Sequence, residues 1–331
     1  MINKIICFLV LIELILVPTS YANNEDTIKE QQSTFGINSF ITNAKEYVDE
    51  SFLNENDITN IFNSAVKGQV DNKTIFGKIA GIFGKQMKEI LGTLASILAI
   101  IVIHSILKSI SESLENDNIS KLIYYVQYIL IVTILMKNFA GIIEIVKEAS
   151  SNMVGFINLL VPLLTSLMLF TGSITTTSML EPAILFATNL VGNLIQSVLI
   201  PIVLVIASFS IISKISDKIK IDKLTKFLRS GIVWALGIIL TIFVSVVSLE
   251  GTLSSSVDGV TAKTTKAVVS SAIPIVGKIL GDAVDSVLGC GIILKNAVGI
   301  IGVIIILTIC IVPILKLAIT TITYKLIARR L

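Results

Sequence analysis

The chain has 331 residues, of which 53% are hydrophobic and only 15% are charged. Its mean hydropathy is +0.89. Soluble domains carry about 25% charged residues, so this composition excludes an ordinary soluble protein and indicates a polytopic, all-α membrane protein. The net charge of +3 gives no reason to expect a nucleic-acid partner.

Residues 1–22 are typical of a cleaved signal peptide. Lys4 supplies a positive start, Ile5 to Val17 form an apolar stretch, and Ser20-Tyr21-Ala22 offers a small-x-small cleavage site. An uncleaved signal anchor is the alternative, because Glu13 interrupts the apolar stretch. Either reading places Asn23 and the residues after it outside the cytoplasm.

Residues 23–89 form the one sizeable polar region, which we expect to be extracytoplasmic. Apolar and aromatic residues recur in it at roughly helical spacing, among them Phe35, Phe40, Tyr47, Ile58 and Phe62. This spacing predicts short amphipathic helices. They are too small for a stable core of their own, so we expect them to pack on the membrane or on a partner.

Six apolar runs follow, and each is a candidate membrane-spanning segment. They lie at 90–107, 122–143, 153–170, 183–213, 230–249 and 296–320. We group the first four into a membrane bundle, 90–213, and place a C-terminal membrane region at 230–331. Pro162, Pro201 and Pro313 fall inside three of the runs, where neighbouring helices or water can satisfy the freed carbonyl groups.

Basic residues predict the orientation of the chain. The loop 214–229 carries six of them against two aspartates, and the tail carries Lys325, Arg329 and Arg330. By the positive-inside rule both segments are cytoplasmic. The run 230–249 then leads outward, 250–295 is extracytoplasmic, and 296–320 returns.

An extracytoplasmic Asn23 and a cytoplasmic Lys214 require an odd number of crossings between them, whereas the runs number four. The run 183–213 would measure about 46 Å as one helix, against roughly 30 Å of hydrocarbon. We therefore favour splitting it near Pro201, which gives about seven spans in the whole chain. The alternative places 122–143 at the interface and gives five.

Sequence motifs for catalysis or nucleotide binding are absent. The chain has no GxxxxGK[ST], GxGxxG, HExxH or GxSxG, and "GKILGDAVD" departs from the GxGD pattern of intramembrane aspartyl proteases. We therefore expect neither an enzyme nor a cofactor. His104 and Lys108, one turn apart, are read as interfacial rather than as a proton relay. We expect Cys290 and Cys310 to be buried thiols rather than a disulfide.

The stretch "IPIVGKILGDAVDSVLGCG", residues 273–291, interrupts the apolar pattern. On a helix Lys278, Asp282 and Asp285 share one face, because they fall at i, i+4 and i+7. Pro274 favours a helix start nearby, and Gly289 and Gly291 predict its end. About fifteen residues are too few to span a bilayer.

A second short helix is predicted upstream, in residues 256–271. The two would form a re-entrant or interfacial amphipathic pair, either lining a protein-enclosed polar cavity or presenting a solvated charged face. The candidate docking or vestibule residues are Asp258, Lys263, Lys266, Pro274, Lys278, Asp282, Asp285, Lys295 and Asn296.

This same region resembles the C-terminal part of the stage III sporulation protein AE family. The resemblance rests on ordered elements: Ser256-Val257-Asp258-Gly259-Val260, the alanine-lysine run to Lys266, Ile273-Pro274, Gly281-Asp282 with Asp285, Leu288-Gly289-Cys290, and Lys295-Asn296-Ala297-Val298-Gly299. The order of signal peptide, polar region and spans agrees as well. The resemblance therefore extends in architecture over the whole chain.

The resemblance implies a role in endospore formation. Members of the family belong to the stage III A assembly in the mother-cell membrane around the engulfed forespore. That assembly includes a secretion-type ATPase and meets stage II sporulation protein Q from the forespore side. The implied function is a membrane platform or conduit in a secretion-like channel complex that supports late forespore development, with the lipid bilayer as its surroundings.

Two other functions fit the same sequence. A self-contained secondary transporter would explain the glycine- and proline-interrupted segments. Such a transporter should have a matching segment in its first half, where only the short sequence "GKIAG" resembles "GKILG". A purely structural membrane scaffold is the third reading.

Overall fold

The structure of the chain is a computed structural model, and every described element in it is helical. It describes residues 25–48, 53–69, 117–215, 222–245 and 276–328, together with isolated helical positions between 84 and 109. The predicted signal peptide, the upstream half of the amphipathic pair, His104 and Lys108 lie outside the described residues.

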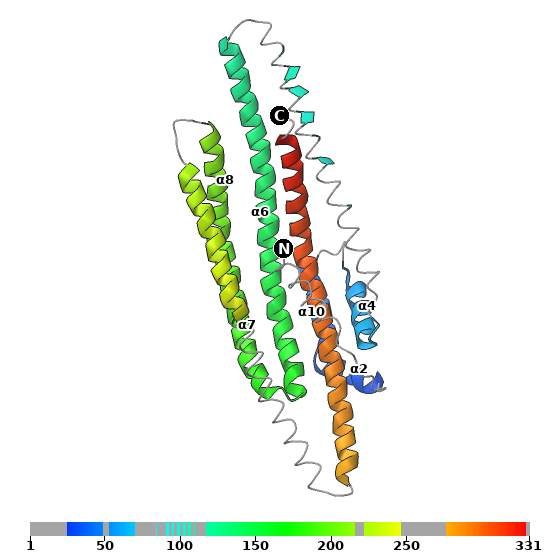
Figure 1. Cartoon of the computed structure of the whole chain (residues 1–331). Helices are drawn as coiled ribbons and strands as arrows, with labels where there is room; N and C mark the ends of the chain where they lie inside the picture. Colours follow the sequence, from blue (N-terminus) through cyan, green and yellow to red (C-terminus); the bar gives the residue numbers. More distant parts are fainter. Residues whose placement is uncertain are drawn as a thin grey trace. The chain divides into compact units, whose positions relative to one another are not determined.

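Short helices come first in the chain (Figure 1). They are α2 (Glu25–Thr34), α3 (Ile37–Ala44), the 3-10 turn η1 (Lys45–Tyr47) and α4 (Glu55–Val66). Their buried residues include Ile37, Phe40, Ile58 and Phe62, so the predicted amphipathic pattern is confirmed.

Long helices follow. They are α6 (Asp117–Phe170), α7 (Ile174–Leu194), the π-helical turn η2 (Ile195–Leu199), α8 (Ile200–Ile215), an unlabelled helix Asp222–Ser245, and α10 (Val276–Ala328). Within the described residues, four stretches are long and apolar enough to cross a membrane: Val132–Phe170, Ile174–Ser210, Asp222–Ser245 and Ser286–Ile322.

The runs 122–143 and 153–170, predicted as separate spans, belong to the single helix α6. Its 54 residues measure about 81 Å. The residues between the runs, EIVKEASSN, lower the hydropathy but contain no glycine or proline. Glu, Lys and Ala are strong helix formers, so the helix continues where hydropathy alone indicated a boundary.

The predicted split near Pro201 is also wrong, because helical backbone continues from α7 through η2 into α8. Proline removes a backbone donor, and the chain responds with a π turn immediately before Pro201. There the N–H of Ile200 donates to the carbonyl of Ile195, five residues back. The disturbance is absorbed within one turn, as is usual for π bulges.

The predicted helix end at Gly289 and Gly291 is wrong as well. α10 runs through both glycines as part of one 53-residue helix. An internal glycine costs about 1 kcal/mol relative to alanine, which a well-packed helix can offset. The stretch that carries Lys278, Asp282 and Asp285 is therefore the beginning of a long helix rather than a short separate one.

The chain divides into two compact units. The first comprises Met1–Asn72, Asn152–Val191 and Gly237–Thr308, and the second comprises Lys73–Ser151, Gly192–Leu236 and Ile309–Leu331. The first unit contains α2–α4, the end of α6, most of α7 and the first part of α10. Most of the described buried side chains belong to it.

Candidate functional site

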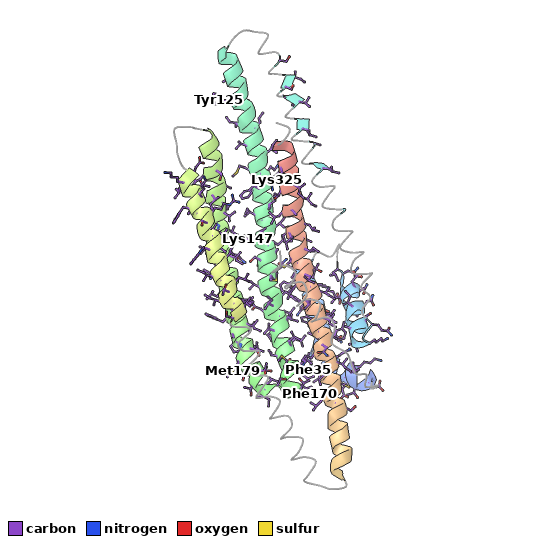
Figure 2. All side chains as sticks on the ribbon, in the orientation of Figure 1. Phe35, Tyr125, Lys147, Phe170, Met179 and Lys325 are labelled. Atoms are coloured by element: carbon purple, nitrogen blue, oxygen red, sulfur yellow. The ribbon has the colours of Figure 1, made fainter. Side chains whose placement is uncertain are left out.

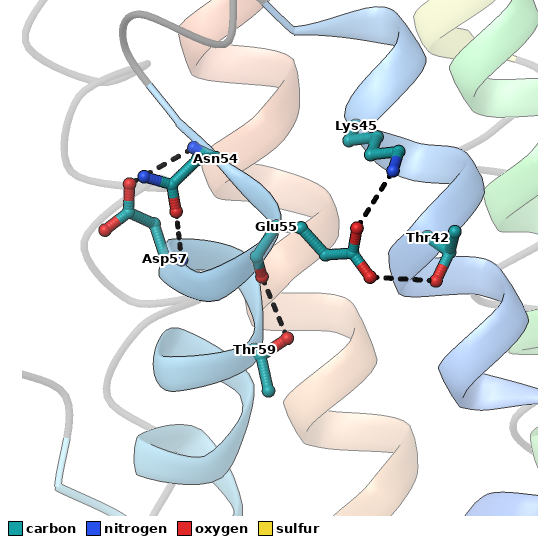
Figure 3. Close-up of polar contacts among 6 residues, drawn as sticks. All are labelled: Thr42, Lys45, Asn54, Glu55, Asp57 and Thr59. Carbon is teal, nitrogen blue, oxygen red and sulfur yellow. Dashed lines mark hydrogen bonds and ion pairs between the residues drawn. The ribbon is translucent and has the colours of Figure 1, made fainter.

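The short helices of the first unit are shaped by local sequence signals. Gly36 separates α2 from α3 and has a φ of 65°, a left-handed conformation that glycine adopts without a steric penalty. Asn54 caps α4 through a capping box, in which its side chain accepts from the N–H of Asp57 at 2.9 Å while Asp57 accepts from the N–H of Asn54 at 3.1 Å (Figure 3).

An ion pair joins η1 to α4. Lys45 Nζ lies 2.9 Å from Glu55 Oε2, and the Thr42 hydroxyl donates to Glu55 Oε1 at 3.2 Å (Figure 3). The hydrogen bond from Lys45 is the main reason that the pKa of Glu55 lies below its usual value, followed by the Thr42 hydrogen bond and the Lys45 charge. These contacts fix α4 relative to α3.

Aromatic packing holds α3 and η1 against α6. Phe156 of α6 is fully buried, and its ring centroid lies 6.1 Å from that of Phe40 and 6.2 Å from that of Tyr47. Gly155 meets the Tyr47 ring so closely that a Cβ there would collide with it. The polar helices thus pack on helices of their own chain.

A second contact joins α2 and Phe35, the residue directly after it, to the end of α6 and to α10. Phe35 and Phe170 meet edge to face with their centroids 5.1 Å apart (Figure 2). Gly291 of α10 faces the same Phe170 ring. Gln31, only 7% exposed, donates from Nε2 to the carbonyl of Val287 at 3.1 Å, while its Oε1 is buried without a partner.

Polar pairs connect α6 to α7 beyond the turn at 171–173. The Thr165 hydroxyl donates to Glu181 Oε2 at 2.9 Å. Two turns further from the loop, Asn158 and Asn189 exchange reciprocal side-chain hydrogen bonds of 3.2 and 3.0 Å. Such bonds fix the register of neighbouring membrane helices.

Packing contacts, hydrogen bonds and an ion pair among the described residues build this site. Among the described residues, no three His, Cys, Asp or Glu side chains are placed to hold a metal ion. Cys290 and Cys310 are free thiols, with Cys290 buried as predicted and Cys310 half-buried. The arrangement holds the short polar helices to long helices that are apolar enough to cross a membrane.

The predicted site residues are only partly visible in this arrangement. Lys295 and Asn296 are half-buried on α10. Lys278, Asp282 and Asp285 lie on the helical backbone of α10, but their side chains fall outside the described set. Four further candidates lie outside the described residues: Asp258, Lys263, Lys266 and Pro274.

Several residues that build this site were not among the predicted ones. Glu181 had a usable signal, because it is a lone carboxylate directly before the apolar run 183–213. Asn158 and Asn189 also stand out in the sequence, because they are polar amides within apolar runs, but an uncharged amide indicates a functional position less strongly than a carboxylate does. Gln31 and Phe170 gave none, since their roles depend on contacts between segments far apart in the chain.

Comparisons with known proteins agree on one family. The family described as stage III sporulation protein AE matches residues 56–329. Stage III sporulation protein AE of Bacillus subtilis (strain 168) is 33% identical over 240 residues, which cover 72% of this chain and 59% of that protein. The chain thus spans about three fifths of the length of this relative. No solved structure matches.

Proposed function

The chain belongs to the stage III sporulation protein AE family, and from this premise we propose that it is a membrane platform of the sporulation channel complex. It would lie in the mother-cell membrane that surrounds the forespore, with its amino-terminal helices in the intermembrane space. Its partners there would be other stage III A proteins and, indirectly, stage II sporulation protein Q. A secretion-type ATPase of the assembly would supply the energy.

The observation that supports a platform is the attachment of α2–α4 to α6 and α10. Phe156 and Phe170 hold the polar helices to α6 within its candidate span, Val132–Phe170. Partners that bind α2–α4 would therefore be held at a fixed position relative to the membrane. A freely tethered polar segment would give no such positioning.

The beginning of α10 is the proposed docking surface, together with Lys295 and Asn296. Lys278, Asp282 and Asp285 share a face because of their helical spacing. Replacing both aspartates by alanine should reduce the yield of heat-resistant spores while the protein still accumulates. Wild-type spore yield in this variant would mean that the charges are merely solvated.

The experiment that tests the function is deletion of the gene in its sporulating host, followed by fluorescence microscopy of the membranes. We expect arrest just after engulfment, normal vegetative growth, and recovery when the gene is restored at another locus. Normal spores, or a growth defect tied to one nutrient, would contradict the platform and favour a transporter.

A further inference from the structure

The helix Asp222–Ser245 differs from the other candidate spans because the described part of the chain does not cover it. None of its described side chains is buried. The buried share of its most apolar stretch is 0%, compared with 17% or 33% for the other three spans. A helix that is apolar all round is stable only when apolar surroundings enclose it. Lipid is therefore the direct neighbour of this helix in a membrane.

Basic residues mark the point where this helix leaves the hydrocarbon. The apolar run 230–249 has twenty residues, which measure about 30 Å as a helix and match the thickness of the hydrocarbon core. Lys223, Lys226 and Arg229 precede this run, and all three are exposed. None of their side chains forms an ion pair or hydrogen bond with another described residue. Three positive charges thus lie at the level of the lipid headgroups.

Two exposed aromatic side chains continue the helix face that begins at Lys223. Phe227 and Trp234 follow it at i+4 and i+11, so the three residues share one face. Phe227 is 73% exposed and Trp234 is 72% exposed, the highest values among the large hydrophobic side chains that the structure describes. This face therefore offers a positive charge at the headgroup level and aromatic surface below it, which matches the phosphate and the acyl chain of a phospholipid.

The local charge favours an anionic phospholipid over a zwitterionic one. The loop 214–229 carries six basic residues against two aspartates, and the positive-inside rule places it in the cytoplasm. A zwitterionic headgroup brings a positive group together with its phosphate, and a basic cluster repels that positive group. Basic clusters that directly flank a span on the cytoplasmic side attract anionic lipids, by about fivefold for each basic residue near the surface.

We propose that Lys223 and Lys226 bind the phosphate of an anionic phospholipid in the cytoplasmic leaflet, and that its acyl chain lies along Phe227 and Trp234. The two lysines are three residues apart, so they are neighbours on the helix surface and both reach one headgroup. Interfacial anchors of this kind set the rotation and depth of a helix that has few protein contacts. Lipid binding goes beyond the proposed function and is measured without any sporulation phenotype.

Fluorescence quenching in liposomes tests the site. Trp234 is the only tryptophan in the chain, so its emission reports on this helix alone. The purified full chain is inserted into phosphatidylcholine liposomes that contain a small fraction of spin-labelled phosphatidylglycerol or, in a matched set, spin-labelled phosphatidylcholine. We expect a preference of about fivefold or more for the anionic lipid, which decreases at high salt concentration. Equal quenching by the two lipids would overturn the proposal.

Substitutions at single lysines test whether the preference is local. Lys223→Gln should reduce it to below about twofold, whereas Lys223→Arg should retain it. Lys29→Gln is the matched control, because Lys29 is an exposed lysine of α2 and its loss removes the same charge. Equal effects of the two glutamine variants would mean that only net charge matters and would contradict the site. A preference that soluble glycerol phosphate abolishes would also contradict it, since the cluster would then bind free phosphate rather than lipid.

Discussion

At the scale of single residues, Gly291 lies where the Phe170 ring leaves no room for a side chain. A Cβ at this position would come within 2.7 Å of Phe170 Cδ1, so alanine would force the ring away from Phe35. We expect Gly291→Ala to lower the free energy of unfolding by about 1–3 kcal/mol. Hydrogen exchange of α2 in the detergent-solubilised protein would report the loosened contact.

Gly289 is the matched control for this prediction. A Cβ there would meet nothing within 4 Å, so Gly289→Ala should be neutral or should stabilise the helix by up to about 1 kcal/mol. If both alanine variants behave alike, the contact of Gly291 with Phe170 is not the reason that glycine is needed.

Glu55 predicts a pH dependence of the amino-terminal helices. Because its pKa is lower in the folded chain, the ionised form stabilises folding above the unfolded value of about 4.3. That stability is lost as the pH falls through the folded pKa. We expect Glu55→Gln to speed hydrogen exchange in α4 at neutral pH by less than about fivefold. The difference from the wild type should vanish only once the pH has fallen below the lowered pKa of Glu55 in the folded chain, and a difference that persists there would rule out this ion pair as its cause.

The sequence specified some of these residues and not others. Asn54 and Asp57 are local signals, since a capping box depends on a spacing of three residues. Gly291 was predicted to end a helix because glycine is common at helix ends. The contact that gives Gly291 a different role is with Phe170, which is more than a hundred positions away in the chain. Whether a glycine ends a helix or makes room for a ring depends on that long-range contact, which one sequence does not reveal.

At the scale of elements, the attachment of α3 and η1 depends on Phe156. Phe156→Ala removes a fully buried ring that contacts Phe40 and Tyr47, and a truncation of this kind costs about 3–5 kcal/mol. Limited proteolysis should therefore cleave the amino-terminal segment much faster in this variant. Phe227→Ala, at a position that is 73% exposed, should leave the cleavage rate unchanged. Equal rates for Phe156→Ala and the wild type would show that α3 is held by other contacts.

The helices themselves were predicted better than their ends. The spacing of apolar residues gave α3 and α4, because one buried face is a local property of the sequence. The lengths of α6 and α10 were missed, since hydropathy reports where a helix can enter lipid and not where it stops. Helix continuity is decided by propensity and packing. Propensity is favourable across EIVKEASSN, and the buried residues of α10 around Cys290 and Leu294 offset the cost of the neighbouring glycines.

At the scale of the whole molecule, the contacts of α2 restrict how the chain crosses the membrane. If residues 23–89 lie outside the cytoplasm, Phe170 and Val287 lie outside with them, because Phe35 and Gln31 contact these residues. α6 then crosses once and ends outside. Seven crossings would instead make 153–170 an inward span and place Phe170 in the cytoplasm.

We therefore predict five crossings: the four candidate spans and the apolar run 90–107. An alkaline phosphatase fusion at Thr175, just past the α6–α7 turn, should be active because the enzyme folds only outside the cytoplasm. A fluorescent-protein fusion at Lys220, in the basic loop, should fluoresce because that loop is cytoplasmic. A fluorescent-protein fusion after Arg330 is the cytoplasmic control. If the phosphatase at Thr175 is inactive while both fluorescent fusions are bright, Thr175 lies in the cytoplasm. The membrane would then separate α2 from Phe170, which would contradict the packing of the first unit.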